Sequence, residues 1–196
     1  MNSDIGKKYD KIASWWHENH VNSSYGLEQI ERAIRYCEQK GSALDVGCGS
    51  GGRIIRRLIQ ENFSVYGIDA SAEMIAIARS QHRECNFEQA NIIDWESDQH
   101  FDLIIAWDSI FHLPMEMQRP VISKLCRMLK HSGILIYTFG DAIDEHESEW
   151  HEDHFPYSSI GINGNLKAFM EGGCECLHLE LDQYPEKHVY IIAQKR

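Results

Sequence analysis

A short apolar run that ends in a cluster of glycines is the feature of this 196-residue sequence that most constrains its fold. The segment Asp45-Val-Gly47-Cys-Gly49-Ser-Gly51-Gly52 continues the apolar run that starts at residue 43 and precedes a helical apolar stripe over residues 54–59. Glycines at such a junction let the backbone turn tightly and approach a ligand without a Cβ in the way. The N-terminus of the following helix offers unpaired N–H groups to an anionic group. The segment therefore predicts a ligand-binding turn between a buried strand and a helix.

The alternation of apolar runs and amphipathic helices continues to residue 140. Apolar runs predict further strands at residues 65–68, 86–90, 101–107 and 134–139. Near-continuous apolar strands separated by helices indicate a parallel sheet that is covered on both faces. Two last strands, at 177–182 and 189–193, include one with a period of two, which is typical of an antiparallel edge. We therefore expect a doubly wound α/β fold with a seven-stranded, mostly parallel sheet and helices on both faces.

The length and the alternation predict one domain over residues 1–196, with an amphipathic helical cap at residues 1–40. The alternation stops at residues 141–163, where seven acidic side chains fall within residues 141–153. We expect this acidic insert to fold over the ligand pocket, and a solvated acidic loop is the alternative. His146, His151 and His154 lie in or beside the insert, but their spacing matches no established metal pattern, so no metal site is predicted.

Charge and composition disfavour several classes of protein. The chain has 19 basic and 30 acidic residues, a formal net charge of −11, which disfavours nucleic acid as a partner. Its six cysteines form no Cys-x-x-Cys pair and suggest free thiols. The chain starts with no apolar h-region, and no run approaches the ~18 apolar residues of a membrane span. We expect a cytoplasmic protein without a membrane anchor, and its oligomeric state stays open.

Asp69 ends the second apolar run, about twenty residues after the glycine turn. An acidic side chain there can accept both ribose hydroxyls of a nucleoside. Gly47, Gly49 and Gly52 also satisfy Gly-x-Gly-x-x-Gly, so an NAD(P)-dependent oxidoreductase stays an alternative. Two points disfavour it: the turn does not open the domain, and too little chain follows residue 150 for a substrate domain.

Together these segments resemble the class I S-adenosylmethionine-dependent methyltransferases that act on small molecules. The match to the family's first motif runs from Leu44 to Gly51, and the match to the second from Gly67 to Met74. Residues 101–114 and 129–136 match two later motifs, and residues 9–13 resemble the family's N-terminal cap. The resemblance covers residues 40–140 well.

The resemblance implies a role for each matching position. The turn at Gly47, Cys48 and Gly49 would lie against the methionine portion of S-adenosylmethionine, with Asp45 near its amino group. Asp69 would hold the ribose. The other implied contacts are Ala70 and Met74 on the ribose and adenine side, Asn91 and Ile92 at the adenine ring, Trp107 and Asp108 beside the sulfonium and its amino-acid tail, and Tyr9 at the cofactor or acceptor. The family often has Asp where this chain has Asn91, whose side-chain oxygen can still accept from the adenine amino group.

The implied reaction is an in-line methyl transfer to a small-molecule acceptor. A sulfonium methyl is already activated, so the enzyme mainly aligns the nucleophile and excludes water. His112, just after the fourth strand, is the best placed general base, and a structural or substrate-contacting histidine is the alternative. A non-catalytic regulatory partner that binds S-adenosylmethionine is a further alternative. Trp15, Trp16, His17 and His20 could line the same pocket or belong to the core.

Overall fold

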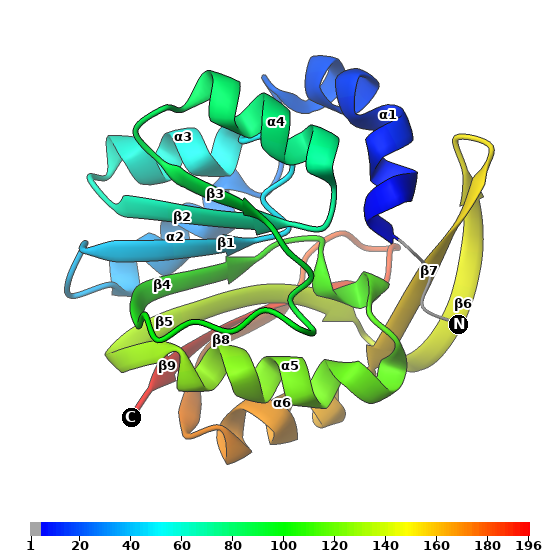
Figure 1. The fold of residues 1–196 in the computed structure, drawn as a ribbon. Helices are drawn as coiled ribbons and strands as arrows, with labels where there is room; N and C mark the ends of the chain where they lie inside the picture. The colour runs from blue at the N-terminus through cyan, green and yellow to red at the C-terminus, as the bar shows by residue number, and fades with distance from the viewer. Residues whose placement is uncertain (1–4) are drawn as a thin grey trace.

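The predicted alternation forms a seven-stranded sheet with helices on both faces (Figure 1). The computed structural model describes residues 5–196. The strand order is β3-β2-β1-β4-β5-β9-β8, and the strands are β1 (Ser42–Val46), β2 (Ser64–Asp69), β3 (Asn86–Gln89), β4 (Phe101–Ala106), β5 (Leu129–Gly140), β8 (Cys174–Leu181) and β9 (His188–Lys195). Strands β1 to β5 pair in parallel, whereas β9 is antiparallel to both β5 and β8. The doubly wound, mostly parallel α/β fold is confirmed.

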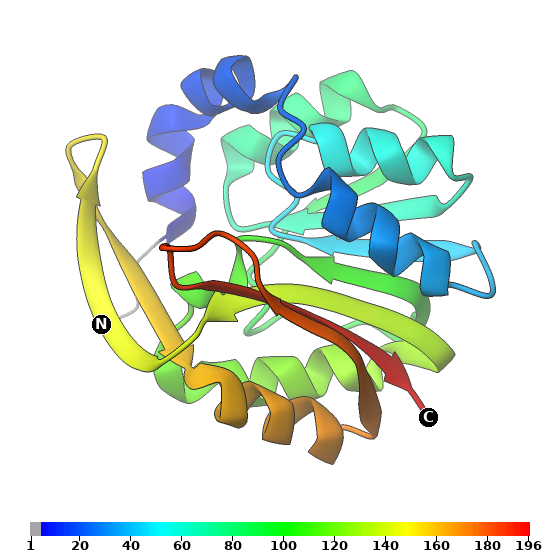
Figure 2. The same cartoon turned by 180° about the vertical axis from the view of Figure 1, so that it is seen from behind.

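Helices on the two faces of the sheet create two hydrophobic cores (Figures 1 and 2). The helices are α1 (Ile5–His20), α2 (Leu27–Tyr36), α3 (Arg53–Gln60), α4 (Ala72–Gln81), α5 (Met115–Arg127), α6 (Gly161–Glu171) and the 3-10 turn η1 (Ile110–His112). One core lies between the sheet and α5 with α6, the other between the sheet and α2, α3 and α4. No helix within residues 5–196 is both long and apolar enough to cross a bilayer.

The acidic insert forms an antiparallel hairpin of β6 (Ile143–Trp150) and β7 (Asp153–Ile160), which was not expected. Asp and Glu are depleted in strands, so composition alone favoured a loop. β7 buries Phe155 and Ser158 against the rest of the molecule, whereas β6 stays exposed and keeps its carboxylates in water. Figure 1 shows the hairpin standing beside α1, away from the main sheet, and β7 contacts both α1 and η1.

The other differences from the expected elements are shifts of their ends. β5 starts at Leu129 instead of residue 134, because Leu129 pairs with Phe101 before an irregularity in the register. α6 spans residues 161–171 and follows the hairpin directly. The expected cap at residues 1–40 contains α1 and α2, and its first four residues lie outside the described part of the chain.

Candidate active site

A cavity of about 240 Å³ opens at the carboxyl ends of β1, β2 and β4, where ligands bind in doubly wound sheets. All the site residues expected from the sequence line it: Tyr9, Asp45, Gly47, Cys48, Gly49, Asp69, Ala70, Met74, Asn91, Ile92, Trp107, Asp108 and His112. Trp16 and His20, which the sequence left between pocket and core, also line it. The fold therefore brings the candidate residues together, while their individual roles stay predictions.

The glycine turn between β1 and α3 leaves open space on its cavity side. Gly47 and Gly49 have φ angles of 76° and 54°, in the left-handed region that favours glycine. A Cβ on Gly47 would lie 2.3 Å from the Cβ of Ser109, whereas a Cβ on Gly49 would meet only the Trp16 indole nitrogen, at 3.8 Å. Gly47 is thus required by close packing, and Gly49 leaves room for a ligand against the backbone.

The side chain of Asp69 stabilises the glycine turn by a hydrogen bond that needs no ligand. Its Oδ2 accepts from the Gly49 N–H at 2.9 Å, and its Oδ1 accepts from the Ser71 N–H at 2.8 Å. Burial raises the pKa of Asp69, and these two N–H groups partly offset that effect. Each carboxylate oxygen can accept a further bond, so the expected ribose contact is compatible with the bracing role.

Asp45 is a buried carboxylate that lacks a donor. Its residue is 2% exposed, and no group among residues 5–196 donates a hydrogen bond to its side chain. Burial, with the charge of Asp69, raises the pKa of Asp45 to about 7. An uncompensated buried charge is costly, and a cationic ligand group in the cavity would relieve that cost.

The loop that carries Asn91 and Ile92 at the cavity is held by a buried ammonium group. Oδ1 of Asn91 accepts from the Ile93 N–H at 3.0 Å, so the expected adenine contact would be a second bond to that oxygen. Lys124 on α5 donates to the carbonyls of Ile92, Ile93 and Trp95, at 3.1, 2.9 and 2.8 Å. Sequence reasoning missed Lys124, because one lysine in an amphipathic helix is normally solvated.

His112 is joined to Tyr9 across the cavity wall. The Nδ1 atom of His112 lies 2.7 Å from the Pro156 carbonyl, which only accepts, so Nδ1 carries the hydrogen. The Nε2 atom is then an acceptor, and the Tyr9 hydroxyl donates to it at 3.0 Å. Burial lowers the pKa of His112 to about 4, so its ring is neutral near pH 7. The sequence did not indicate that β7 would supply Pro156.

α1 forms the outer wall of the cavity, and the hairpin of β6 and β7 packs against α1 without lining the cavity itself. Trp16 stacks on His20, with centroids 4.0 Å apart, while Trp15 packs on Trp150 and is 40% exposed. Asp153 of the β6–β7 hairpin pairs with the ammonium groups of Lys8 and Lys11 on α1. His17 on α1 contacts the Ser50 hydroxyl at 3.0 Å. Among residues 5–196, no three His, Cys, Asp or Glu side chains are placed to hold a metal ion.

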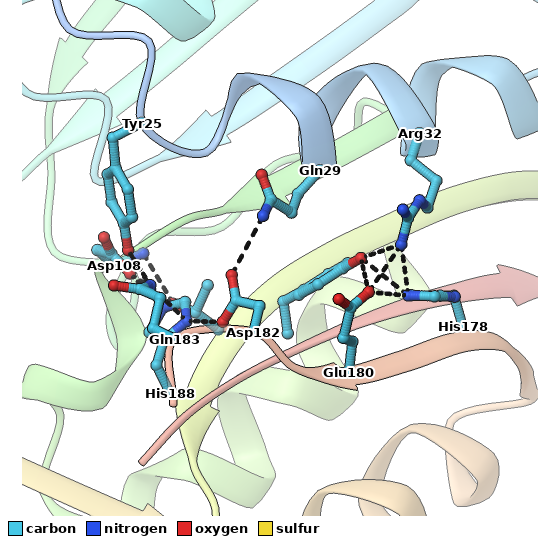
Figure 3. Close-up of polar contacts among 11 residues, drawn as sticks. Tyr25, Gln29, Arg32, Asp108, His178, Glu180, Asp182, Gln183 and His188 are labelled. Atoms are coloured by element: carbon cyan, nitrogen blue, oxygen red, sulfur yellow. Dashed lines mark hydrogen bonds and ion pairs between the residues drawn. The ribbon is translucent and has the colours of Figure 1, made fainter. Parts of the chain in front are cut away.

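Asp108, which follows β4, is hydrogen-bonded to the C-terminal hairpin formed by β8 and β9 (Figure 3). Its backbone has a φ of 50°, and its N–H donates to the Thr138 hydroxyl oxygen at 2.8 Å. Thr138 donates in turn to Oδ1 of Asp108 at 3.2 Å, and Nε2 of His188 lies 3.0 Å from the same oxygen. Sequence reasoning missed His188, which is 80 positions from Asp108.

Sequence comparisons identify the family. A family model described as a methyltransferase domain matches residues 43–133. The ubiquinone biosynthesis O-methyltransferase of Rickettsia prowazekii (strain Madrid E) is 30% identical over 169 residues, covering 74% of this chain and 66% of the relative. The chain belongs to the class I S-adenosylmethionine-dependent methyltransferases. The trans-aconitate 2-methyltransferase of Escherichia coli (strain 55989 / EAEC) is 32% identical over 144 residues, covering 67% of the present methyltransferase and 55% of that enzyme.

Solved structures agree on the fold of this methyltransferase. The magnesium protoporphyrin IX methyltransferase of Synechocystis PCC 6803, with bound S-adenosylhomocysteine, has a TM-score of 0.77 at 14% identity, covering 98% of each chain. A methyltransferase of Clostridium acetobutylicum ATCC 824 has a TM-score of 0.73 at 13% identity, covering 96% of this chain and 99% of that one. The chain spans 66% of the length of the Rickettsia relative and 55% of the length of the Escherichia coli relative.

S-adenosylmethionine is the cofactor of this methyltransferase, and the residues of the cavity fit it. The carboxylate of Asp45 receives no hydrogen bond from residues 5–196 and suits an ammonium group. The space beside Gly49 admits a ligand against the backbone, and Asp69 retains acceptor capacity. When bound, the cofactor would supply an activated methyl group on a sulfonium.

Proposed function

We propose that this chain transfers the methyl group of S-adenosylmethionine to a small-molecule acceptor by in-line displacement. The observation that carries the proposal is the cavity in which the unpaired Asp45 carboxylate, Asp69 and the open glycine turn meet. The names of the two sequence relatives, one in ubiquinone biosynthesis and one for trans-aconitate, support a small-molecule acceptor. We place the reaction in the cytoplasm, and the net charge of −11 argues against a nucleic-acid substrate.

The chain's own contribution is binding, orientation and exclusion of water. Asp45 would pair with the amino group of the cofactor, and Asp69 would accept from its ribose while keeping Gly49 in place. Asn91 and Ile92 would border the adenine. The wall built by α1, with the hairpin packed behind it, would keep water from the reacting atoms, which favours transfer over hydrolysis.

We further propose that Tyr9 and His112 act as a pair on the acceptor's proton. The acceptor's proton would pass to the Tyr9 oxygen as the Tyr9 proton passes to Nε2 of His112, 3.0 Å away. Because the pKa of His112 is about 4, the pair suits a proton that becomes strongly acidic as the new bond forms. His112 is thus a base that acts through Tyr9.

Binding and transfer are tested in sequence on the purified chain. We expect calorimetry to show binding of S-adenosylmethionine and S-adenosylhomocysteine but not of reduced nicotinamide dinucleotide. Asp69→Asn should weaken binding of both by about 10- to 100-fold, because a hydrogen bond to a buried charge contributes about 1.5–3 kcal/mol. The matched control is Asp98→Asn at an exposed position outside the cavity, which should leave affinity unchanged.

Methyl release is then measured against a panel of metabolites. No binding of either sulfur ligand by the folded chain would reject the assignment. Binding of both without methyl release to any acceptor would favour the non-catalytic, regulatory alternative. Preferential binding of the nicotinamide dinucleotide would favour an oxidoreductase.

A further inference from the structure

A histidine from the C-terminal hairpin lies between two carboxylates at the edge of the cavity (Figure 3). Nε2 of His188 is 3.0 Å from Oδ1 of Asp108, and Nδ1 is 2.5 Å from Oδ1 of Asp182. Ionised carboxylates only accept hydrogen bonds, so both ring nitrogens must carry hydrogens. The two carboxylates therefore favour an imidazolium at His188, although the Gln183 amide nitrogen, which only donates, lies 2.9 Å from the same Nδ1 and competes with its hydrogen.

The three side chains are withdrawn from water, which strengthens their interaction. The side chains of Asp182, His188 and Asp108 are 4%, 15% and 29% exposed. Burial by itself lowers the pKa of His188, but Asp108 and Asp182 outweigh it and raise the pKa above its usual value. The other ionisable groups nearby are the Tyr25 phenol, 3.5 Å from Nε2, and Arg53, whose charge acts on Asp108.

This cluster connects parts of the chain that share no local sequence pattern. Asp182 follows β8, His188 begins β9, and Asp108 follows β4 and lines the cavity. Gln29 on α2 also donates to Asp182, at 3.2 Å, so α2 is held by the same carboxylate. His188 and Thr138 both contact Oδ1 of Asp108, and Oδ2 takes neither bond.

We infer that His188 is a positioning residue of the cofactor site: its imidazolium holds the Asp108 carboxylate in place and couples cofactor affinity to the protonation of His188. A neutral ring has one N–H and satisfies only one of the two carboxylates, so Asp108 is then held less firmly. The coupling has a definite sign. Affinity is highest at a pH below the pKa of His188 and falls as the pH rises through that pKa. This inference rests on the proposed function.

The test is calorimetry with S-adenosylmethionine and S-adenosylhomocysteine between about pH 6 and pH 9, across the range in which histidine titrates. Asp45, whose pKa is about 7, titrates in this range in every variant, so the readout is the affinity of the unmodified chain relative to that of His188→Gln, which cannot become charged. We expect His188→Gln to bind both ligands about five- to tenfold more weakly than the unmodified chain at the low end of the range and about equally at the high end.

The matched control is His178, on the hairpin of β8 and β9 that also carries His188. His178 on β8 also contacts a carboxylate, Glu180, at 2.8 Å, and the Arg32 guanidinium (Figure 3). Glu180 does not line the cavity, whereas Asp108, the partner of His188, does. His178→Gln should therefore keep the affinity and the pH dependence of the unmodified chain.

A measurement on the unmodified chain guards against a variant that does not fold. Because coupling is reciprocal, S-adenosylhomocysteine should raise the pKa of His188, read from its ring resonances by NMR. An unchanged pKa on binding, or a His188→Gln variant that binds S-adenosylmethionine as tightly as or more tightly than the unmodified chain, overturns the inference. In both cases the unmodified chain still binds its ligands, so the proposed function survives. If the unmodified chain binds neither ligand, the proposed function and this inference fail together.

Discussion

Replacing Lys124 by methionine tests how the loop at residues 91–95 beside the cavity is held. The Lys124 side chain is 8% exposed, and its ammonium has four acceptors within 3.1 Å. Three are the carbonyls of Ile92, Ile93 and Trp95, and the fourth is Oε1 of Glu96 at 2.9 Å. Methionine keeps most of the apolar stem and removes the charged donor, so the loss of these bonds dominates the effect.

The expected loss of stability follows from these contacts. A hydrogen bond to a charged group contributes about 1.5–3 kcal/mol, but the three do not add fully because freed carbonyls regain water. Glu96 contributes little, since its side chain is 76% exposed. We expect Lys124→Met to lower the free energy of unfolding by about 2–4 kcal/mol, because three buried carbonyls lose a charged donor while no buried charge is left behind.

Urea unfolding followed by circular dichroism measures this change, with an unchanged m-value as the sign of two-state behaviour. Lys167→Met is the control, because Lys167 pairs with Glu171 at 3.8 Å on the surface and both side chains are more than 60% exposed. We expect the control to change stability by less than about 0.5 kcal/mol. If Lys124→Met costs less than about 1 kcal/mol, the loop is held by other contacts and the reasoning is wrong.

Two further substitutions test the Asp45 carboxylate and the Tyr9–His112 pair of the cavity. Burial raises the pKa of Asp45 to about 7 in the folded chain, whereas its pKa in the unfolded chain is about 4. The ionised side chain therefore destabilises the fold increasingly as the pH rises from about 4 to about 7. Asp45→Asn should therefore raise the free energy of unfolding at pH 8, by about 1–4 kcal/mol, while lowering the affinity for S-adenosylmethionine. Equal stability of the two forms in thermal melts from pH 4 to pH 8 would contradict the reasoning. Tyr9→Phe should lower the rate of methyl transfer about a hundredfold and change S-adenosylhomocysteine affinity by less than threefold. An unchanged turnover rate at saturating substrates would remove Tyr9 and His112 from the proton transfer.

The mostly parallel, doubly wound sheet and the ligand position could be predicted because both follow from short-range pattern. The apolar runs alternate with helical stripes, and right-handed crossovers then leave few topologies. The glycine turn and Asp69 both come at the ends of strands, so a parallel sheet brings them to one edge whatever the details of packing. The cavity lining expected from residues 9 to 112 was recovered for this reason.

The partners of individual side chains needed the tertiary structure. Tyr9 and His112 are 103 positions apart, and Asp108 and His188 are 80 apart. The hairpin of β6 and β7 was missed because its stability comes from the packing of β7 on α1 and η1 and not from strand propensity.

The amino-acid sequence by itself determined the doubly wound sheet, the glycine turn and the carboxylate that ends β2, because periodic burial and tight turns are properties of neighbouring residues. Only the tertiary structure decided that Asp45 lacks a donor among residues 5–196, that burial lowers the pKa of His112, that His112 contacts Tyr9, and that two carboxylates raise the pKa of His188. Those states depend on burial and on groups supplied by distant elements, and no local spacing encodes either.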